Sequence, residues 1–125
     1  MFVSLFEDHK VSVRSETVEA DAARILVQYH RFPGTNSTVA HASIDGFELA
    51  VETSPCVDPR NFREDLGIKY STERVMEKAK SKLWEIHGAG LLTLMKHYQQ
   101  KSTVEQFIKD YGHIYNIQKV EDATW

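Results

Sequence analysis

Residues 55–92 constrain the fold of this 125-residue chain most strongly, because they carry one continuous helical pattern. Asp58 before Pro59 is typical of a helix start, since the carboxylate caps free backbone N–H groups and proline fits the first helical position. Apolar and small residues then recur at steps of three and four, which places them on one helix face. They are Ile68, Thr72, Val75, Ala79, Leu83, Ile86 and Gly90. The pattern predicts a helix over residues 59–88 that ends at Gly88, where glycine favours a left-handed terminal conformation.

A β-hairpin is predicted upstream of this helix, where Asp45 and Gly46 separate two segments of alternating polarity. A two-residue Asp-Gly loop favours a type I′ turn and fixes the pairing of the flanking strands. The loop predicts three apolar pairs on one face, Ile44 with Phe47, Ala42 with Leu49 and Ala40 with Val51. The polar face is expected to pair Ser43 with Glu48, His41 with Ala50 and Val39 with Glu52. One face is therefore expected to be buried, and its small alanines leave room for the long helix.

Shorter elements are expected on both sides of the hairpin and the long helix. Alternation around Val11 and Val13 predicts one or two short strands within residues 2–13. A helix is expected over residues 16–30, ending before Pro33-Gly34. Its stripe consists of Val18, Ala22, Ile25 and Tyr29.

The segment after Gly90 predicts a short helix over residues 91–98, followed by another that starts at a capping box in residues 102–105 and ends at Gly112. Residues 113–120 suit a last strand or an extended tail. The expected fold class is α+β: a small antiparallel sheet built on the Asp-Gly hairpin and packed against a long central helix. An N-terminal helix and short C-terminal helices complete it.

Composition is that of one ordinary globular domain, residues 1–125, with 42% hydrophobic and 26% charged residues. A net charge of −3 gives no overall attraction to long nucleic acid or to an anionic membrane. No apolar run approaches the length that spans a bilayer. The N-terminus lacks the basic region and small-residue cleavage site of a signal peptide. A single cysteine fits a reducing compartment, so we expect a cytoplasmic chain.

A family signature overlaps the hairpin and the long helix. It is carried by Asp45-Gly46-Phe47, Cys56-Val57-Asp58-Pro59, Asn61-Phe62, Gly67, Ala79, Lys82-Leu83-Trp84, Gly88 and Leu91-Leu92. These motifs resemble a family of small phage proteins named after gene forty-nine of one podophage and gene sixty-six of another. The family pattern runs ACVDPxNF, an acidic pair, G, a long helix, KxW and EGYLL, after a strand with NGF. The resemblance covers residues 38–92.

Two features depart from the family pattern. The segment between Asn61-Phe62 and Trp84 is longer by about four residues, roughly one helical turn, so the buried stripe stays in phase. Ile68 stands after the glycine, where the family has a basic residue. The family is functionally uncharacterised, so the resemblance implies a setting, a phage or prophage accessory protein inside an infected bacterium. The β core with long helices is also similar to phage sponge proteins that sequester cyclic nucleotide immune signals, such as cyclic ADP-ribose in Thoeris defence.

The start of the long helix is the expected binding site for a small phosphate-bearing ligand. Backbone N–H groups are free in the first helical turn, where anions bind. Arginine side chains there pair with phosphate through two N–H groups, and phenylalanine rings stack on bases. The expected ligand-binding residues are Phe47, Arg60, Asn61, Phe62, Arg63 and Lys82, with Lys82 reaching in from another subunit. The structural alternative is that Asn61 caps the helix while Phe62 packs on the hairpin. Trp84 has the same two interpretations, with core packing favoured.

Other candidate sites have structural interpretations. Cys56 has no local base and is expected to be a buried thiol. The six histidines do not form a metal-ligand spacing, and we expect no metal or cofactor. Arg74, Lys78 and Lys82 form a basic stripe that either holds phosphate groups or is a solvated face that balances nearby glutamates.

Three functions remain open. The first is a non-enzymatic anti-defence protein that sequesters a nucleotide-type immune signal, either cyclic ADP-ribose or a cyclic oligonucleotide. The second is an inhibitor that binds a host enzyme or defence protein. The third is a small enzyme acting on a nucleotide. Exposed sheet edges and several apolar faces also predict a homo-oligomer, most simply a dimer.

Overall fold

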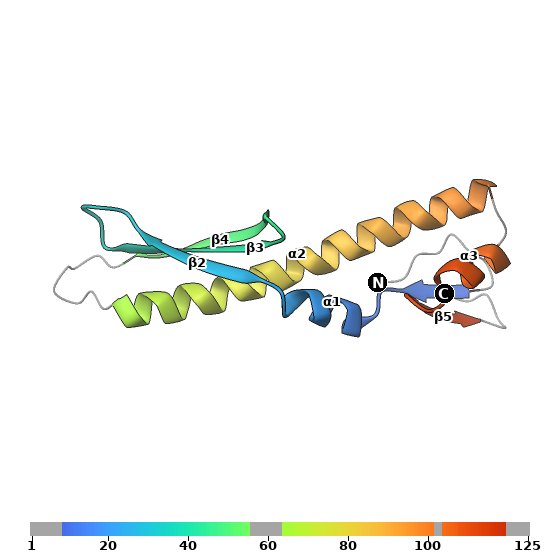
Figure 1. Ribbon diagram of the computed structural model, residues 1–125, viewed down its shortest axis with the longest axis horizontal. Helices are drawn as coiled ribbons and strands as arrows, with labels where there is room; N and C mark the ends of the chain where they lie inside the picture. The colour runs from blue at the N-terminus through green and yellow to red at the C-terminus, as the bar shows by residue number, and fades with distance from the viewer. Residues whose placement is uncertain (1–8, 56–63, 102–103, 120–125) are drawn as a thin grey trace. The chain divides into compact units, whose positions relative to one another are not determined.

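The computed structural model describes residues 9–55, 64–101 and 104–119 (Figure 1). The helices and strands in chain order are β1 His9–Ser12, α1 Ser15–Ala22, β2 Leu26–Arg31, β3 Ser37–Ile44, β4 Phe47–Pro55, α2 Glu64–Lys101, α3 Val104–Tyr111 and β5 Asn116–Lys119. The fold class is therefore α+β, as expected, with small antiparallel sheets and a long central helix. The chain forms two compact units, residues 21–83 and residues 1–20 with 84–125, and α2 contributes to both.

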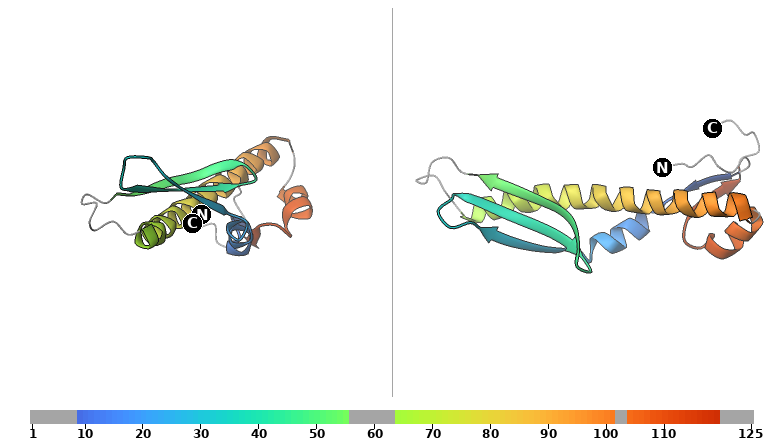
Figure 2. Two further views of the ribbon diagram at one scale, coloured as in Figure 1. Left: turned by 60° about the vertical axis from the view of Figure 1, so that its left-hand side comes forward. Right: turned by 90° about the horizontal axis from the view of Figure 1, so that it is seen from above.

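The sheet of residues 21–83 has the strand order β2-β3-β4, with each neighbouring pair antiparallel (Figures 1 and 2). Asp45 and Gly46 link β3 to β4 with φ angles of 50° and 83°. Two consecutive positive φ angles are what a type I′ turn requires, and Asp and Gly tolerate them. The predicted hairpin turn is therefore confirmed.

The pairing within the hairpin follows the prediction only next to the turn. Ile44 lies opposite Phe47 and Ser43 opposite Glu48, as expected, but the register shifts between Ala42 and Ser43. The predicted pairing of Ala42 with Leu49 and of Ala40 with Val51 is wrong. Beyond the shift the pairs are Ala42 with Ala50, His41 with Val51, Ala40 with Glu52 and Val39 with Thr53.

The physical reason is a β-bulge, in which an extra residue of β4 faces a single position of β3 and moves every later residue to the other face. Leu49 stays buried at 7% exposure, whereas Val51 moves to the outer face and is 44% exposed. Phe47, expected on the buried face, is 57% exposed. Ala40 and Ala42 are fully buried, so the alanine part of the predicted face is confirmed.

The predicted helix over residues 16–30 is wrong after Ala22. A turn follows α1, with the Arg24 amide donating to the Asp21 carbonyl at 2.9 Å, and the chain then enters β2. Every residue of β2 pairs with a residue of β3. Four apolar residues at helical spacing therefore did not predict a helix correctly here. Strand β3 was available as a partner, and β-branched and aromatic side chains favour a paired strand.

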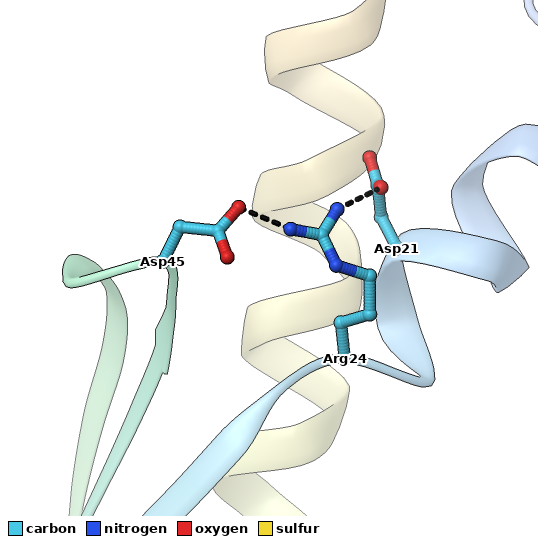
Figure 3. A network of polar contacts seen from close by, with 3 residues as sticks. All are labelled: Asp21, Arg24 and Asp45. Carbon is cyan, nitrogen blue, oxygen red and sulfur yellow. Dashed lines mark hydrogen bonds and ion pairs between the residues drawn. The ribbon is translucent and has the colours of Figure 1, made fainter.

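Arg24 links this turn to the tip of the hairpin (Figure 3). Its guanidinium donates to the Asp21 carboxylate at 3.3 Å and to the carboxylate of Asp45. The hydrogen bond and charge of Asp45 raise the pKa of Arg24, with a smaller contribution from Asp21. All three side chains are solvent-accessible, so the network orients the turn and contributes little to the free energy of unfolding.

Helix α2 continues through Gly88, so the predicted end at Gly88 and the separate helix at residues 91–98 are wrong. Neither Gly88 nor Gly90 has a positive φ. Leu91 and Met95 beyond them are fully buried. Burial of two large side chains outweighs the cost of roughly 1 kcal/mol for each helical glycine. The predicted start at Asp58-Pro59 lies outside the described residues.

The buried stripe of α2 is confirmed in part. Its buried residues are Gly67, Ser71, Val75, Ala79 and Leu83, followed by Gly88, Leu91 and Met95. The predicted Ile86 and Gly90 are exposed, and Ile68 and Thr72 are half-buried. The steps of four end at Leu83 and the stripe resumes five residues later, where residues 21–83 give way to the second unit.

Polar contacts join residues 64–83 of α2 to its sheet. The Tyr29 and Thr72 hydroxyl groups lie 2.6 Å apart. Arg74 donates to the Thr53 carbonyl at 3.1 Å, and the Lys78 ammonium lies 2.6 Å from the Glu52 carboxylate. Together with the buried alanines, these contacts confirm that the helix packs against the hairpin (Figure 2).

In the second unit, β1 and β5 form an antiparallel ribbon, which confirms a strand in each of the two terminal segments. Helix α3 places Phe107 in the core at 0% exposure. Ring centroids of Tyr98, Tyr111 and Tyr115 lie 5.3, 5.5 and 6.3 Å from that of Phe107. Gly112 ends α3 as predicted, with its amide donating to the Ile108 carbonyl at 2.8 Å. The proposed capping residues 102–103 lie outside the described residues.

Candidate functional site

The ribbon of β1 and β5 has one apolar face and one polar face. Val11 lies opposite Ile117 and is fully buried. On the other face, Lys10 lies opposite Gln118 and Ser12 opposite Asn116. Directly paired residues of an antiparallel ribbon share a face, so these four polar side chains form one surface. The Asn116 amide donates to the Ser12 hydroxyl at 3.4 Å, which links the two strands across that surface.

Arg14 follows β1 and is held by the turn that ends α3. Its Nη1 donates to the His113 carbonyl at 2.8 Å and its Nη2 donates to the Gly112 carbonyl at 3.2 Å. Two carbonyl groups thus fix the direction of the guanidinium before any ligand arrives. A guanidinium carries five N–H donors, so donors remain for a further acceptor.

An open pocket of about 420 Å³ lies beside these residues within the second unit. It is lined by Lys10, Ser12, Arg14, Gly112, Tyr115, Asn116, Ile117 and Gln118. The volume falls within the range of small-molecule sites, roughly 300–1,000 Å³. Two lining side chains are cationic, four are neutral hydrogen-bonding groups, and no carboxylate is among these described lining residues. The arrangement suits a small anion that accepts charge-assisted hydrogen bonds.

Tyr115 forms an aromatic part of the lining. Its ring stacks on Phe107 with an interplanar angle of 17°. Burial, and to a smaller extent the neighbouring Tyr111, raise the pKa of the Tyr115 hydroxyl. The phenol therefore stays neutral at physiological pH, and adds no negative charge beside the two cations.

Four of the six predicted ligand-binding residues, Arg60 to Arg63, lie outside the described residues. The remaining two are exposed and do not line the pocket: Phe47 follows the hairpin turn and Lys82 lies on α2. The predicted site at the start of the long helix therefore stays a prediction. Cys56 also lies outside the described residues.

The basic stripe of α2 contacts its own sheet. Arg74 and Lys78 bond the Thr53 carbonyl and the Glu52 carboxylate, both on β4. These contacts favour a structural role for the two cations. The observed partners lie on β4, whereas the sequence suggested glutamates of the helix itself. Trp84, for which core packing was favoured, is 37% exposed.

Within residues 9–55, 64–101 and 104–119, no three histidine, cysteine or acidic side chains lie close enough together to hold a metal ion. Across the same ranges, no helix is long and apolar enough to cross a membrane.

Sequence reasoning did not identify Lys10, Arg14 or Asn116 as site residues. Part of the signal was present, since Ser12 and Arg14 alternate with Val11 and Val13. The missing information was the partner strand, which lies about a hundred residues away in the chain. Comparison of this chain with protein-family models, with curated proteins and with solved structures finds no match.

Proposed function

We propose that this protein binds and sequesters a small phosphate-bearing ligand without chemically converting it. The observation that carries the proposal is the pocket on the β1–β5 ribbon, where the guanidinium of Arg14 is held in place by two carbonyl groups. An anion in this pocket would gain a charge-assisted hydrogen bond from a donor that is already oriented, which lowers the entropy cost of binding.

The biological setting follows from the resemblance to small phage proteins. In that setting the protein acts in the cytoplasm of an infected bacterium as an anti-defence protein. Its ligand would be a nucleotide-type immune signal, cyclic ADP-ribose or a cyclic oligonucleotide. Sequestration requires only tight binding, so the protein needs neither a catalytic group nor a cofactor.

A thermal-shift screen tests the proposal first. Cyclic ADP-ribose isomers, cyclic dinucleotides and inorganic phosphate are added to the purified chain, and a ligand that binds only the folded state raises the melting temperature. Chromatography of the recovered ligand then separates sequestration from catalysis. An unchanged ligand supports the proposal, whereas a converted ligand indicates the small enzyme instead.

Charge-matched variants locate the site by calorimetric titration. Arg14→Gln is expected to weaken binding of the ligand found in the screen by at least tenfold, because it removes a charged donor. Lys96→Gln is the control, since it removes one positive charge from an exposed position of α2 that does not line the pocket. Arg63→Ala tests the site predicted from the sequence. Loss of binding in Arg63→Ala alone would assign the ligand to that other site.

The alternative function is inhibition of a host enzyme or defence protein by a surface of this chain. The outer face of the β2–β4 sheet favours it, because Leu26 and Val51 are 57% and 44% exposed there beside polar side chains. Failure of all small ligands in the screen, together with a host protein that co-purifies from infected cells, would support this alternative.

A further inference from the structure

We infer that the pocket on the β1–β5 ribbon selects a nucleotide, with the base lying against Tyr115 and the phosphate meeting Arg14. The inference rests on the proposed function and assigns residues to the two ends of the ligand. Neither Tyr115 nor Arg14 was identified from the sequence. The pocket combines an aromatic ring, amide side chains and an oriented cation, which are the groups that recognise the parts of a nucleotide.

Tyr115 contributes the aromatic side chain among the residues that line the pocket. One face of the ring stacks on Phe107, whose centroid lies 6.3 Å away. Phe107 is fully buried and is in turn packed against Tyr98 and Tyr111. The stack with Phe107 orients the Tyr115 ring, and Tyr115 is among the residues that line the pocket. A fixed ring loses little entropy when a base stacks on it.

Asn116 and Gln118 also line the pocket. Both are β5 residues on the polar face of the ribbon, opposite Ser12 and Lys10. Amide side chains present a donor and an acceptor side by side, which matches the edge of a purine. A ligand with only a sugar and a phosphate has no base to hydrogen-bond with these amides or to stack on the ring.

The phosphate end is assigned to the guanidinium of Arg14. Its two carbonyl partners belong to Gly112 and His113, and His113 precedes Tyr115 by two residues. The same short turn therefore positions both the cation and the ring. In a nucleotide, the base and the phosphate are separated by one sugar, so a single small pocket can hold both.

Two probes that differ only in the base test this assignment. Adenosine monophosphate and ribose 5-phosphate carry the same phosphate group, and each is titrated calorimetrically into the full chain. Adenosine monophosphate is expected to bind roughly 5- to 150-fold more tightly, the range that one base stacked on an aromatic side chain provides. Saturation-transfer NMR should show the strongest protein contact at the base protons.

Tyr115→Leu and Tyr115→Phe separate stacking from folding. Tyr115→Phe keeps the ring and should retain the preference for adenosine monophosphate, whereas Tyr115→Leu should reduce it to near that of ribose 5-phosphate. If Tyr115→Leu does not fold, the two probes on the wild type and on Tyr115→Phe still test the inference, because equal affinities for both probes would overturn it.

The outcomes distinguish this inference from the proposed function. Equal affinity of the wild type for both probes would overturn the assignment of Tyr115 and leave phosphate binding intact. If Arg14→Gln lowers the affinity for both probes by the same factor, the preference for adenosine monophosphate is unchanged. That result supports the assignment of the phosphate to Arg14 and of the base to Tyr115. Absence of binding by both probes would overturn the inference, whereas the proposed function would be overturned by the failure of every ligand in the thermal-shift screen.

Discussion

Gly67 of α2 faces Thr38 of β3 so closely that a Cβ atom added to the glycine would lie 2.6 Å from the Thr38 Oγ1 and 3.2 Å from its Cβ. A side chain at position 67 would therefore push the helix away from the sheet. Thr38 is 3% exposed and β-branched, which leaves it little freedom to move aside. This contact sets how near the helix approaches the strand.

Gly67→Ala is expected to destabilise residues 21–83, although alanine normally favours a helix by about 1 kcal/mol over glycine. Overpacking at a buried contact costs typically about 1–3 kcal/mol, which outweighs that gain. Gly90→Ala is the control, because it lies in the same helix, is exposed, and has no atom within 4 Å of an added Cβ. Urea unfolding should show a lower midpoint for Gly67→Ala and a higher one for Gly90→Ala. A higher midpoint in both would contradict the close contact.

Thr38→Val is expected to leave the free energy of unfolding unchanged or to raise it by about 1 kcal/mol. The Thr38 Oγ1 is buried and makes no hydrogen bond with the described residues, and a buried hydroxyl without a partner costs roughly 1–3 kcal/mol. Valine has nearly the same shape and suits a strand. A loss above about 1 kcal/mol in urea unfolding would mean that the hydroxyl has a partner after all.

Leu49→Ala tests the bulge in β4. Leu49 is 7% exposed, so removal of its side chain should cost roughly 2–5 kcal/mol in chemical unfolding. Val51→Ala is the matched comparison, because Val51 lies beyond the bulge and is 44% exposed. This substitution should lower the free energy of unfolding by less than about 1 kcal/mol. Equal losses in the two variants would instead support the uninterrupted pairing that the turn alone predicts.

The sequence was most informative where the determining residues are neighbours in the chain. Asp45 and Gly46 specify the turn by themselves, and Val75, Ala79 and Leu83 specify one helix face. The bulge at Leu49 depends instead on which side chains the helix will bury, a condition that lies outside the hairpin. The continuation of α2 through Gly88 likewise depends on the burial of Leu91 and Met95, not on the preference of glycine.

Elements defined by distant partners were the ones that the sequence did not predict fully. Tyr29 completed a helical stripe that began at Val18, and residues 26–31 still became β2, because β3 was available to pair with them. The candidate pocket requires β1 to pair with β5 and Arg14 to reach the carbonyls of Gly112 and His113. No local sequence motif indicates contacts between residues so far apart in the chain, so the sequence did not predict this pocket, and the site predicted at the helix start stays a separate prediction.

A homodimer is a further prediction of the proposed function. The three-stranded sheet of residues 21–83 has two edge strands, β2 and β4, and edges of this kind favour pairing between chains. Size-exclusion chromatography with light scattering at micromolar concentration should give twice the chain mass of 14.4 kDa. A measured mass of one chain would contradict the dimer. It would also contradict the prediction that Lys82 completes a site from a second subunit.

The last prediction concerns acid stability and the carboxylate of Asp110 on α3. Gln106 donates to its Oδ1 at 2.9 Å and the Tyr98 hydroxyl donates to its Oδ2 at 2.8 Å. These two hydrogen bonds lower the pKa of Asp110 below its ordinary value of 3.8, with a smaller contribution from the charge of Lys109. The same bond to Asp110 raises the pKa of the Tyr98 hydroxyl, so its proton remains available for donation.

A carboxyl group whose pKa is lower in the folded chain than in the unfolded chain stabilises the fold above the unfolded value. That contribution is present at neutral pH and is lost as the pH falls below 3.8 through the folded pKa. Asp110→Asn should therefore be less stable than the wild type at pH 7, with a smaller difference at pH 3. Tyr98→Phe keeps the ring and deletes one donor, so it should show the same trend to a lesser degree. Urea unfolding followed by circular dichroism between pH 3 and pH 7 measures the effect, and a difference that is constant across this range would show that Asp110 titrates alike in the folded and unfolded chains.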